Sequence, residues 1–149
     1  MYDKILVPTD GSEGTQKAVD HALRVAEKFG SELHVIYVIN TSAYSTLPAE
    51  ANWESVTSAL RKEGRAATKG IIEEAEDRGI KVERSILEGV PHKEILHYID
   101  DNGIDLVVMG THGKTGLDRF LLGSVTEKVV RSCDIPVLTV KMNPDEQEE

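Results

Sequence analysis

Short apolar runs alternate with longer segments of helical periodicity, and this alternation constrains the fold more than any other feature of the chain. Five runs are predicted strands, at residues 5–7, 33–39, 82–87, 106–109 and 136–140. Helical patterns fill the intervals between them. Because strict alternation with helical crossovers gives parallel pairing, the sequence predicts an α/β fold: an open five-stranded parallel sheet, Rossmann-like, with helices on both faces.

The helical segments carry apolar faces and recognisable ends. The first is expected to bury one face and to stop at Gly30. A long segment at 53–78 contains Gly64 and Gly70, each of which costs about 1 kcal/mol relative to alanine, so its middle is expected to bend. The polar stretch at 41–52 is predicted to be a loop. The predicted apolar face of the first helix comprises Ala18, Ala22, Val25, Ala26 and Phe29.

Size, charge and cysteine content narrow the class of protein. A chain of 149 residues is expected to form one domain, here assigned to residues 1–141, followed by an acidic tail at 142–149 that we expect to be disordered. The net charge of −9 argues against a general nucleic-acid binder. No apolar stretch reaches membrane-spanning length and the N-terminus lacks the pattern of a secretory signal. With the single cysteine Cys133, these features predict a cytoplasmic protein without membrane association.

The stretch after the fourth predicted strand, residues 110–126, carries the chemistry. It contains Gly113-Lys114-Thr115, but only two residues separate Gly110 from Gly113, whereas a P-loop needs four. The glycines allow close backbone approach, and the predicted helix start at Gly123-Ser124-Val125-Thr126 is a potential phosphate site. The alternative is structural, because Ser124 and Glu127 have the spacing of a capping box.

The loop after the first predicted strand reads Pro8-Thr9-Asp10-Gly11. Such sheets bind ligands at the carboxyl ends of their strands, where the strand order reverses. Asp10 could accept hydrogen bonds from ribose hydroxyls, or it could be only a turn or cap residue.

The spacing Gly110-x2-Gly113-x9-Gly123-Ser124 resembles the ATP-binding signature of the universal stress protein family. The opening at residues 5–12 and the close at 133–140 are also similar to that family, so the resemblance covers about residues 1–141. It implies an adenine nucleotide alpha hydrolase-like fold with strand order 3-2-1-4-5. It also implies ATP as the ligand, with Mg²⁺ or Mn²⁺ held through the phosphates. ADP, AMP and a cyclic nucleotide are the alternatives.

The resemblance implies roles for individual residues. Those near the adenosine would be Pro8, Thr9, Asp10, Val38, Met109 and Gly110, and those near the phosphates would be Gly113, Gly123, Ser124, Val125 and Thr126, with His112 in the same loop. It further implies a homodimer formed in part by the last strand, at Val137 to Val140.

Three functions remain open. The first is a nucleotide-responsive binding or signalling module in a stress response, acting on an unnamed protein partner, with no catalytic residue. The second is a slow ATPase in the same pocket, with His112 positioning water and Lys114 or Arg119 stabilising charge. Adenylylating or electron-transfer chemistry is a third possibility. The other histidines, His21, His34, His92 and His97, show no metal-ligand spacing and are predicted to be surface or core residues.

Overall fold

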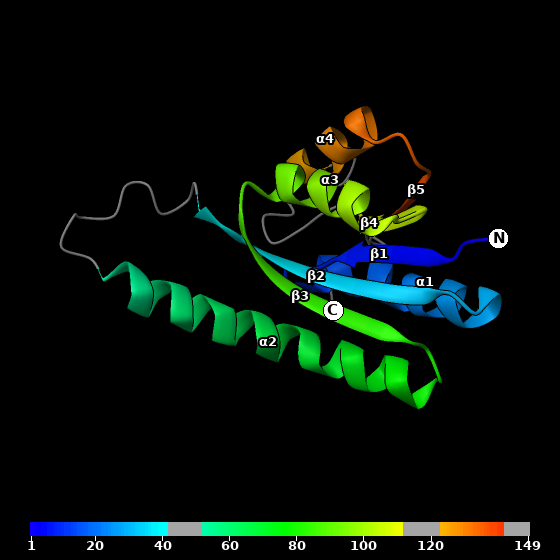
Figure 1. Cartoon of the computed structure of the whole chain (residues 1–149), viewed down its shortest axis with the longest axis horizontal. Coiled ribbons are helices and arrows are strands. Elements are labelled where there is room, and N and C mark those ends of the chain that lie inside the picture. Colours follow the sequence, from blue (N-terminus) through cyan, green and yellow to red (C-terminus); the bar gives the residue numbers. More distant parts are fainter. Residues whose placement is uncertain (42–51, 112–122, 142–149) are drawn as a thin grey trace.

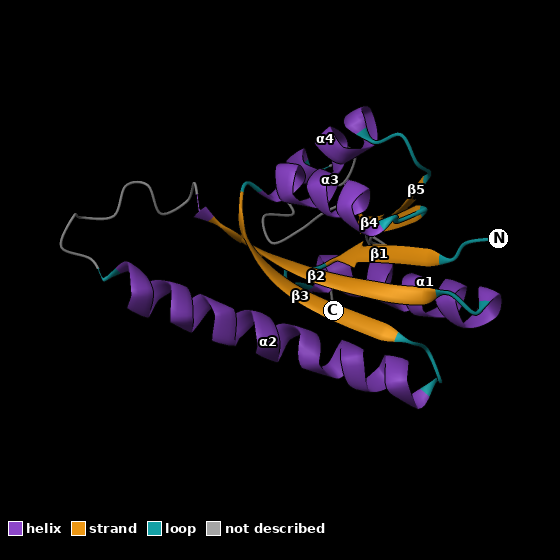
Figure 2. Cartoon of the chain, in the orientation of Figure 1, coloured by secondary structure: helices purple, strands orange, loops and turns teal. Residues whose placement is uncertain are grey.

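The computed structural model describes residues 1–41, 52–111 and 123–141. Strands and helices alternate as predicted, with boundaries within one or two residues of those expected (Figure 2). The elements are β1 (Lys4–Pro8), α1 (Glu13–Phe29), β2 (Glu32–Asn40), α2 (Trp53–Asp77), β3 (Val82–Gly89), α3 (Pro91–Asn102), β4 (Leu106–Gly110), α4 (Ser124–Ser132) and β5 (Val137–Val140). The predicted tail and nearly all of the predicted loop at 41–52 lie outside the described residues.

The five strands form one parallel sheet in the order β3-β2-β1-β4-β5, which confirms the predicted fold and strand order. Helices α1 and α2 cover one face of the sheet, and α3 and α4 cover the other (Figure 1). The order reverses where β1 pairs with both β2 and β4, so a ligand cleft is expected at the carboxyl ends of these strands.

Two apolar cores lie on the two faces because strand side chains alternate with a period of two. In β1, Ile5 and Val7 face the core beneath α1 and α2, whereas Leu6 faces the core beneath α3 and α4. All three are fully buried. None of the helices within the described ranges has both the length and the hydropathy needed to cross a bilayer.

The predicted apolar face of α1 is correct in its centre and wrong at its end. Ala18, Ala22 and Ala26 are buried, but Phe29 is 46% exposed and meets Tyr2 edge-on, with ring centroids 5.7 Å apart. Phe29 is the last residue of α1, directly before the left-handed Gly30 that ends the helix, and its ring lies against Tyr2 instead of entering the core.

Glycine at position 64 has a packing role that propensity alone did not predict. Helix α2 is continuous from Trp53 to Asp77, and Gly64 is buried within it. A Cβ at Gly64 would lie 2.7 Å from Cδ1 of Tyr37 and 3.1 Å from Cδ1 of Ile86. The absence of a side chain therefore lets the helix approach the sheet closely, and it does not interrupt the helix.

Candidate functional site

A cleft of about 360 Å³ opens at the carboxyl ends of β1, β2 and β4, where the strand order reverses. Ten of the twelve predicted site residues line it: Pro8, Thr9, Asp10, Val38, Met109, Gly110, Gly123, Ser124, Val125 and Thr126. The other two, His112 and Gly113, lie outside the described residues, as do Lys114 and Arg119. The fold thus brings together residues that are more than 100 positions apart, while their contacts with a nucleotide remain a prediction.

Five further residues line the cleft, and the sequence reasoning did not find them. They are Thr15, Tyr37, Asn40, Pro91 and Ile95. Three of them could have been found, because Asn40 ends β2 and Pro91 and Ile95 belong to the first turns of the helix that follows β3. The place of Thr15, in the first turn of α1, becomes apparent only from its hydrogen bonds.

A hydrogen-bonded turn connects β1 to α1. One carboxylate oxygen of Asp10, Oδ1, accepts the N–H of Ser12 at 2.9 Å and the hydroxyl of Thr15 at 3.3 Å. The hydroxyl of Thr9 accepts the N–H of Gly11 at 3.1 Å and lies 2.9 Å from the hydroxyl of Thr15. Asp10 therefore has the turn role that the sequence allowed as an alternative, and a ribose contact would be an additional role.

The same turn packs against α2. Gly11 has φ of +80°, in the left-handed region that favours glycine, and a Cβ there would lie 3.1 Å from Cβ of Ala67. Ser12 occupies the N-cap position of α1, but its side chain makes no capping hydrogen bond. Its hydroxyl oxygen is buried and has no hydrogen-bond partner within the described part of the chain.

The N-terminus of α4 forms the opposite wall of the cleft. The N-cap is Gly123 and Ser124 is the first helical residue, so the capping box suggested by Ser124 and Glu127 is not formed. The carboxylate of Glu127 instead accepts a hydrogen bond from Arg131, one turn further along the helix, at 2.5 Å. Among the described residues no side chain caps this helix, so its first-turn N–H groups are directed to the cleft without a side-chain acceptor.

Two hydrogen bonds fix the start of α4 to the end of β4. The buried hydroxyl of Thr126 donates to the carbonyl oxygen of Gly110 at 2.8 Å, and the N–H of Gly123 donates to the carbonyl oxygen of Thr111 at 2.6 Å. The positive end of the α4 dipole is thus held beside the β4 terminus. An apolar wall formed by Val38, Met109 and Ile95 completes the cleft, which can accommodate a ligand with one apolar part and one anionic part.

Comparison with known proteins places the chain in a family. A family model described as the universal stress protein family matches residues 1–141. Universal stress protein MJ0531 of Methanocaldococcus jannaschii is 45% identical over 141 residues, which cover 95% of this chain and 83% of that protein. Universal stress protein YxiE of Bacillus subtilis is 32% identical over 148 residues, covering 95% of this chain and 100% of that protein.

Solved structures agree with this match. Hypothetical protein MJ0577 superposes with a TM-score of 0.85 at 37% identity, covering 96% of this chain and 98% of that one. A universal stress protein in complex with cAMP superposes with a TM-score of 0.64 at 26% identity, covering 94% of this chain and 97% of that one. The sheet order, the cleft at the strand reversal and the family match over nearly the whole chain lead to one conclusion: this chain belongs to the universal stress protein family.

Proposed function

We propose that the cleft binds ATP and that the chain acts in the cytoplasm as a nucleotide-responsive homodimeric module in a stress response. The observation that carries the proposal is the start of α4, where Ser124 and Val125 line the cleft and their first-turn N–H groups have no side-chain cap among the described residues. Such a terminus combines unsatisfied donors with the positive end of a helix dipole, which favours phosphate.

The division of the cleft into two parts supports an adenine nucleotide. Val38, Met109 and Ile95 offer apolar contact for a base, and the hydroxyls of Ser124 and Thr9 lie beside the polar part. A related protein whose solved structure holds cAMP has the same fold, at 26% identity. An adenine nucleotide is therefore the ligand class that fits both the wall and the helix terminus.

The donor set fits a metal ion that arrives with the nucleotide. Asp10 is the one carboxylate among the described lining residues, and its Oδ1 is already hydrogen-bonded within the β1–α1 turn. Mg²⁺ keeps several waters and binds through few carboxylates together with substrate phosphates. Mg²⁺ or Mn²⁺ would accordingly be held by phosphate oxygens, with the protein supplying hydroxyls and backbone around them.

The edge strand β5 supports dimer formation. The carbonyl oxygens of Pro136 and Val140 accept the N–H groups of Val107 in β4 and of Thr111 directly after it. The backbone groups of Val137 and Thr139 therefore point to the outer edge of the sheet. Leu138 is 38% exposed on this strand and Val130 is 41% exposed on α4. An open edge flanked by apolar side chains is suited to pairing with a second copy.

The dimer proposal is tested with a proline at the edge. Thr139→Pro removes an outward N–H, whereas Thr139→Val keeps it and serves as the matched control. Analytical ultracentrifugation is expected to show a dimer for the wild type and Thr139→Val, and a monomer for Thr139→Pro. A Thr139→Pro variant that remains dimeric would remove β5 from the interface.

The nucleotide proposal is tested on protein as purified. Mass spectrometry of the denatured, freshly purified protein is expected to detect a bound adenine nucleotide and to identify it. Calorimetric titration of nucleotide-free protein with ATP and Mg²⁺ should give one site per chain. Absence of binding at millimolar ATP would overturn the proposal.

A turnover assay separates the module from the slow ATPase. We expect hydrolysis far below about 1 s⁻¹, the low end of typical enzyme turnover. His112→Ala is compared with the wild type, because His112 is the candidate water-positioning residue. Turnover of about 1 s⁻¹ or more that His112→Ala abolishes would establish the ATPase in place of the module.

A further inference from the structure

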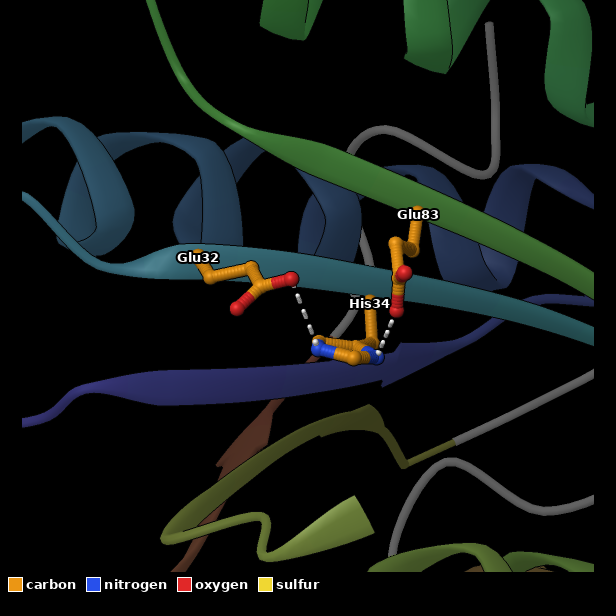
Figure 3. A group of neighbouring side chains, drawn as sticks. All are labelled: Glu32, His34 and Glu83. Atoms are coloured by element: carbon orange, nitrogen blue, oxygen red, sulfur yellow. Dashed lines mark ion pairs between the residues drawn. The ribbon is translucent and has the colours of Figure 1, made fainter.

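A cluster of two carboxylates and one imidazole lies at the amino end of the sheet, away from the cleft. Glu32 and His34 are two residues apart on β2, so their side chains emerge on the same face. Glu83 on β3 is the register partner of His34 and therefore lies on that face as well. Figure 3 shows the two carboxylates on opposite sides of the imidazole ring.

His34 is the buried centre of this cluster. Its side chain is 2% exposed, and its Nδ1 lies 2.7 Å from the hydroxyl oxygen of Tyr98 on α3. Its other ring nitrogen, Nε2, has no hydrogen-bond partner in the described portion of the structure. Nε2 points toward Oε1 of Glu32, 3.5 Å away, and Oε2 of Glu83 lies 3.4 Å from Nδ1. A buried nitrogen thus faces a carboxylate at a distance longer than an ordinary hydrogen bond.

The 3.5 Å separation of His34 Nε2 and Glu32 Oε1 is close to that between two ligand atoms of one metal ion. Two ligand atoms that each lie about 2.1 Å from a zinc ion are about 3.4 Å apart at a tetrahedral angle. We propose that Glu32, His34 and Glu83 form a binding site for one divalent transition-metal ion of the zinc class, with Nε2 as the imidazole ligand. One candidate ligand atom from each of the three residues already lies within 4.8 Å of the other two.

The two carboxylates differ in their exposure to solvent in a way that suits this site. The Glu32 side chain is 18% exposed and already faces Nε2, whereas Glu83 is 57% exposed and lies nearer to Nδ1. One ion can use only one ring nitrogen, so Glu83 must rotate about its side-chain torsions to reach the Nε2 side. Solvent would complete the coordination, since three protein ligands leave one tetrahedral position.

The surroundings of His34 match those of a metal ligand. A ligating histidine usually donates its second N–H to a neighbouring acceptor, and here the Tyr98 hydroxyl is in place to accept from Nδ1. Burial, partly opposed by Glu32 and Glu83, lowers the pKa of His34 below 6.5, which favours the neutral ring that metals require. Imidazole nitrogen and carboxylate oxygen are both ligand types that zinc accepts.

Two lysines near the cluster weaken its electrostatic attraction for a cation. Nζ of Lys81 lies 4.0 Å from Oε1 of Glu32, and Lys81 and Lys4 both act on His34 as positive charges. Lys81 is 80% exposed, so solvent and salt screen its effect. Lys81→Gln is therefore expected to tighten zinc binding by about twofold to fivefold at low salt.

The experiment uses the full chain freed of nucleotide, in phosphate-free buffer, so that no phosphate can carry a metal ion. Zinc is titrated against a chromogenic chelator, and histidine ring nitrogens are followed by long-range ¹H–¹⁵N correlation spectra. We expect one zinc ion per chain and a shift of the His34 Nε2 resonance. Glu32→Gln and Glu83→Gln should each weaken binding about tenfold or more.

Glu88→Gln is the matched control, because Glu88 lies on the same strand as Glu83 but pairs with Arg61 at its far end. It should leave zinc affinity unchanged. The tested carboxylates are partly exposed, so both variants should fold, which circular dichroism checks. The proposal is overturned by zinc binding that does not saturate, that leaves His34 Nε2 unshifted, or that both glutamine variants retain. These outcomes do not depend on whether the cleft binds ATP.

Discussion

The two ends of the sheet offer opposite kinds of chemistry. At the carboxyl end, the cleft is formed by backbone N–H groups, hydroxyls and apolar side chains around Gly123, Ser124 and Thr9. At the amino end, the polar groups are the acceptors Glu32, Glu83 and the ring of His34. The chain carries a net charge of −9, yet its candidate site for an anion needs no cationic side chain among the described residues.

The difference shows how charge preference can arise from two levels of structure. The carboxyl end obtains its donors from the helix start that every β-α connection of this topology places there. The amino end depends on which side chains occupy two strand positions and their register partner, His34 and Glu83. The first preference belongs to the fold, whereas the second belongs to this particular sequence.

The largest effect is expected from a substitution that places a negative charge at the cleft. Ser124→Glu should lower ATP affinity by about a hundredfold or more, because a carboxylate at the first helical position would repel phosphate while favouring the helix dipole. Calorimetry measures the affinity, and Ser124→Ala is the neutral control. Zinc affinity should be unchanged in Ser124→Glu. Full retention of ATP binding would contradict the helix-terminus assignment.

A second substitution tests how closely α2 packs on the sheet that carries both sites. Gly64→Val should reduce the free energy of unfolding by about 2–3 kcal/mol, since its side chain would collide with Tyr37 and Ile86. Gly70→Ala is the matched control on the same helix, where a Cβ meets nothing within 4 Å. It should stabilise the protein by up to about 1 kcal/mol. Urea unfolding measures both, and equal effects of the two substitutions would count against the close approach at Gly64.

Because Tyr37 lines the cleft, Gly64→Val should also weaken ATP binding by several-fold under native conditions. Zinc binding should be retained, because His34 projects from the opposite face of β2 at its amino end. A folded Gly64→Val variant that lost ATP binding and zinc binding equally would show that the two sites are not independent.

A smaller effect is expected from pH at the amino end, measured on metal-free protein. Burial lowers the pKa of His34 below 6.5, so the unfolded chain binds the proton more readily than the folded chain. This contribution to stability is complete above pH 6.5 and is lost as the pH falls through the lowered pKa. Urea unfolding with chelator present, at several values between pH 7.5 and 5, should show a steeper decline for the wild type than for His34→Gln. Parallel declines would contradict this prediction.

The smallest expected effect is the coupling between the ends. Saturating zinc should change ATP affinity by less than about twofold, because distant sites without shared contacts contribute independently. Calorimetric titration with ATP, in the presence and absence of zinc, measures it. A larger change would mean that β2, which contributes to both sites, transmits a rearrangement.

Much of the fold followed from the sequence because it depends on local patterns. Alternation predicted the parallel sheet, and Gly30 marked a helix end where the structure has it. The order of the strands came from the family resemblance. Phe29 was expected to be buried but is exposed, because helical periodicity says which residues share a face and not how far along the helix that face is covered.

Ten of the fifteen lining residues were predicted, from the glycine-bearing segment, the turn after the first strand and the family resemblance. Features that depend on a choice between contacts, or on contacts between distant residues, were not predicted. The capping box failed because α4 has Gly123 and not Ser124 as its N-cap, and Glu127 pairs with Arg131 instead. The cluster at His34 escaped notice because its third member, Glu83, is distant in sequence and reaches it through strand register.

The bonds from Thr126 to Gly110 and from Gly123 to Thr111 fix both ends of the connection between β4 and α4. The entropic cost of closing a loop between two fixed ends grows slowly with its length, so that a doubling adds only about 0.6 kcal/mol. The position of the α4 start beside β4 is therefore maintained by contacts between described residues at the two ends of the connection.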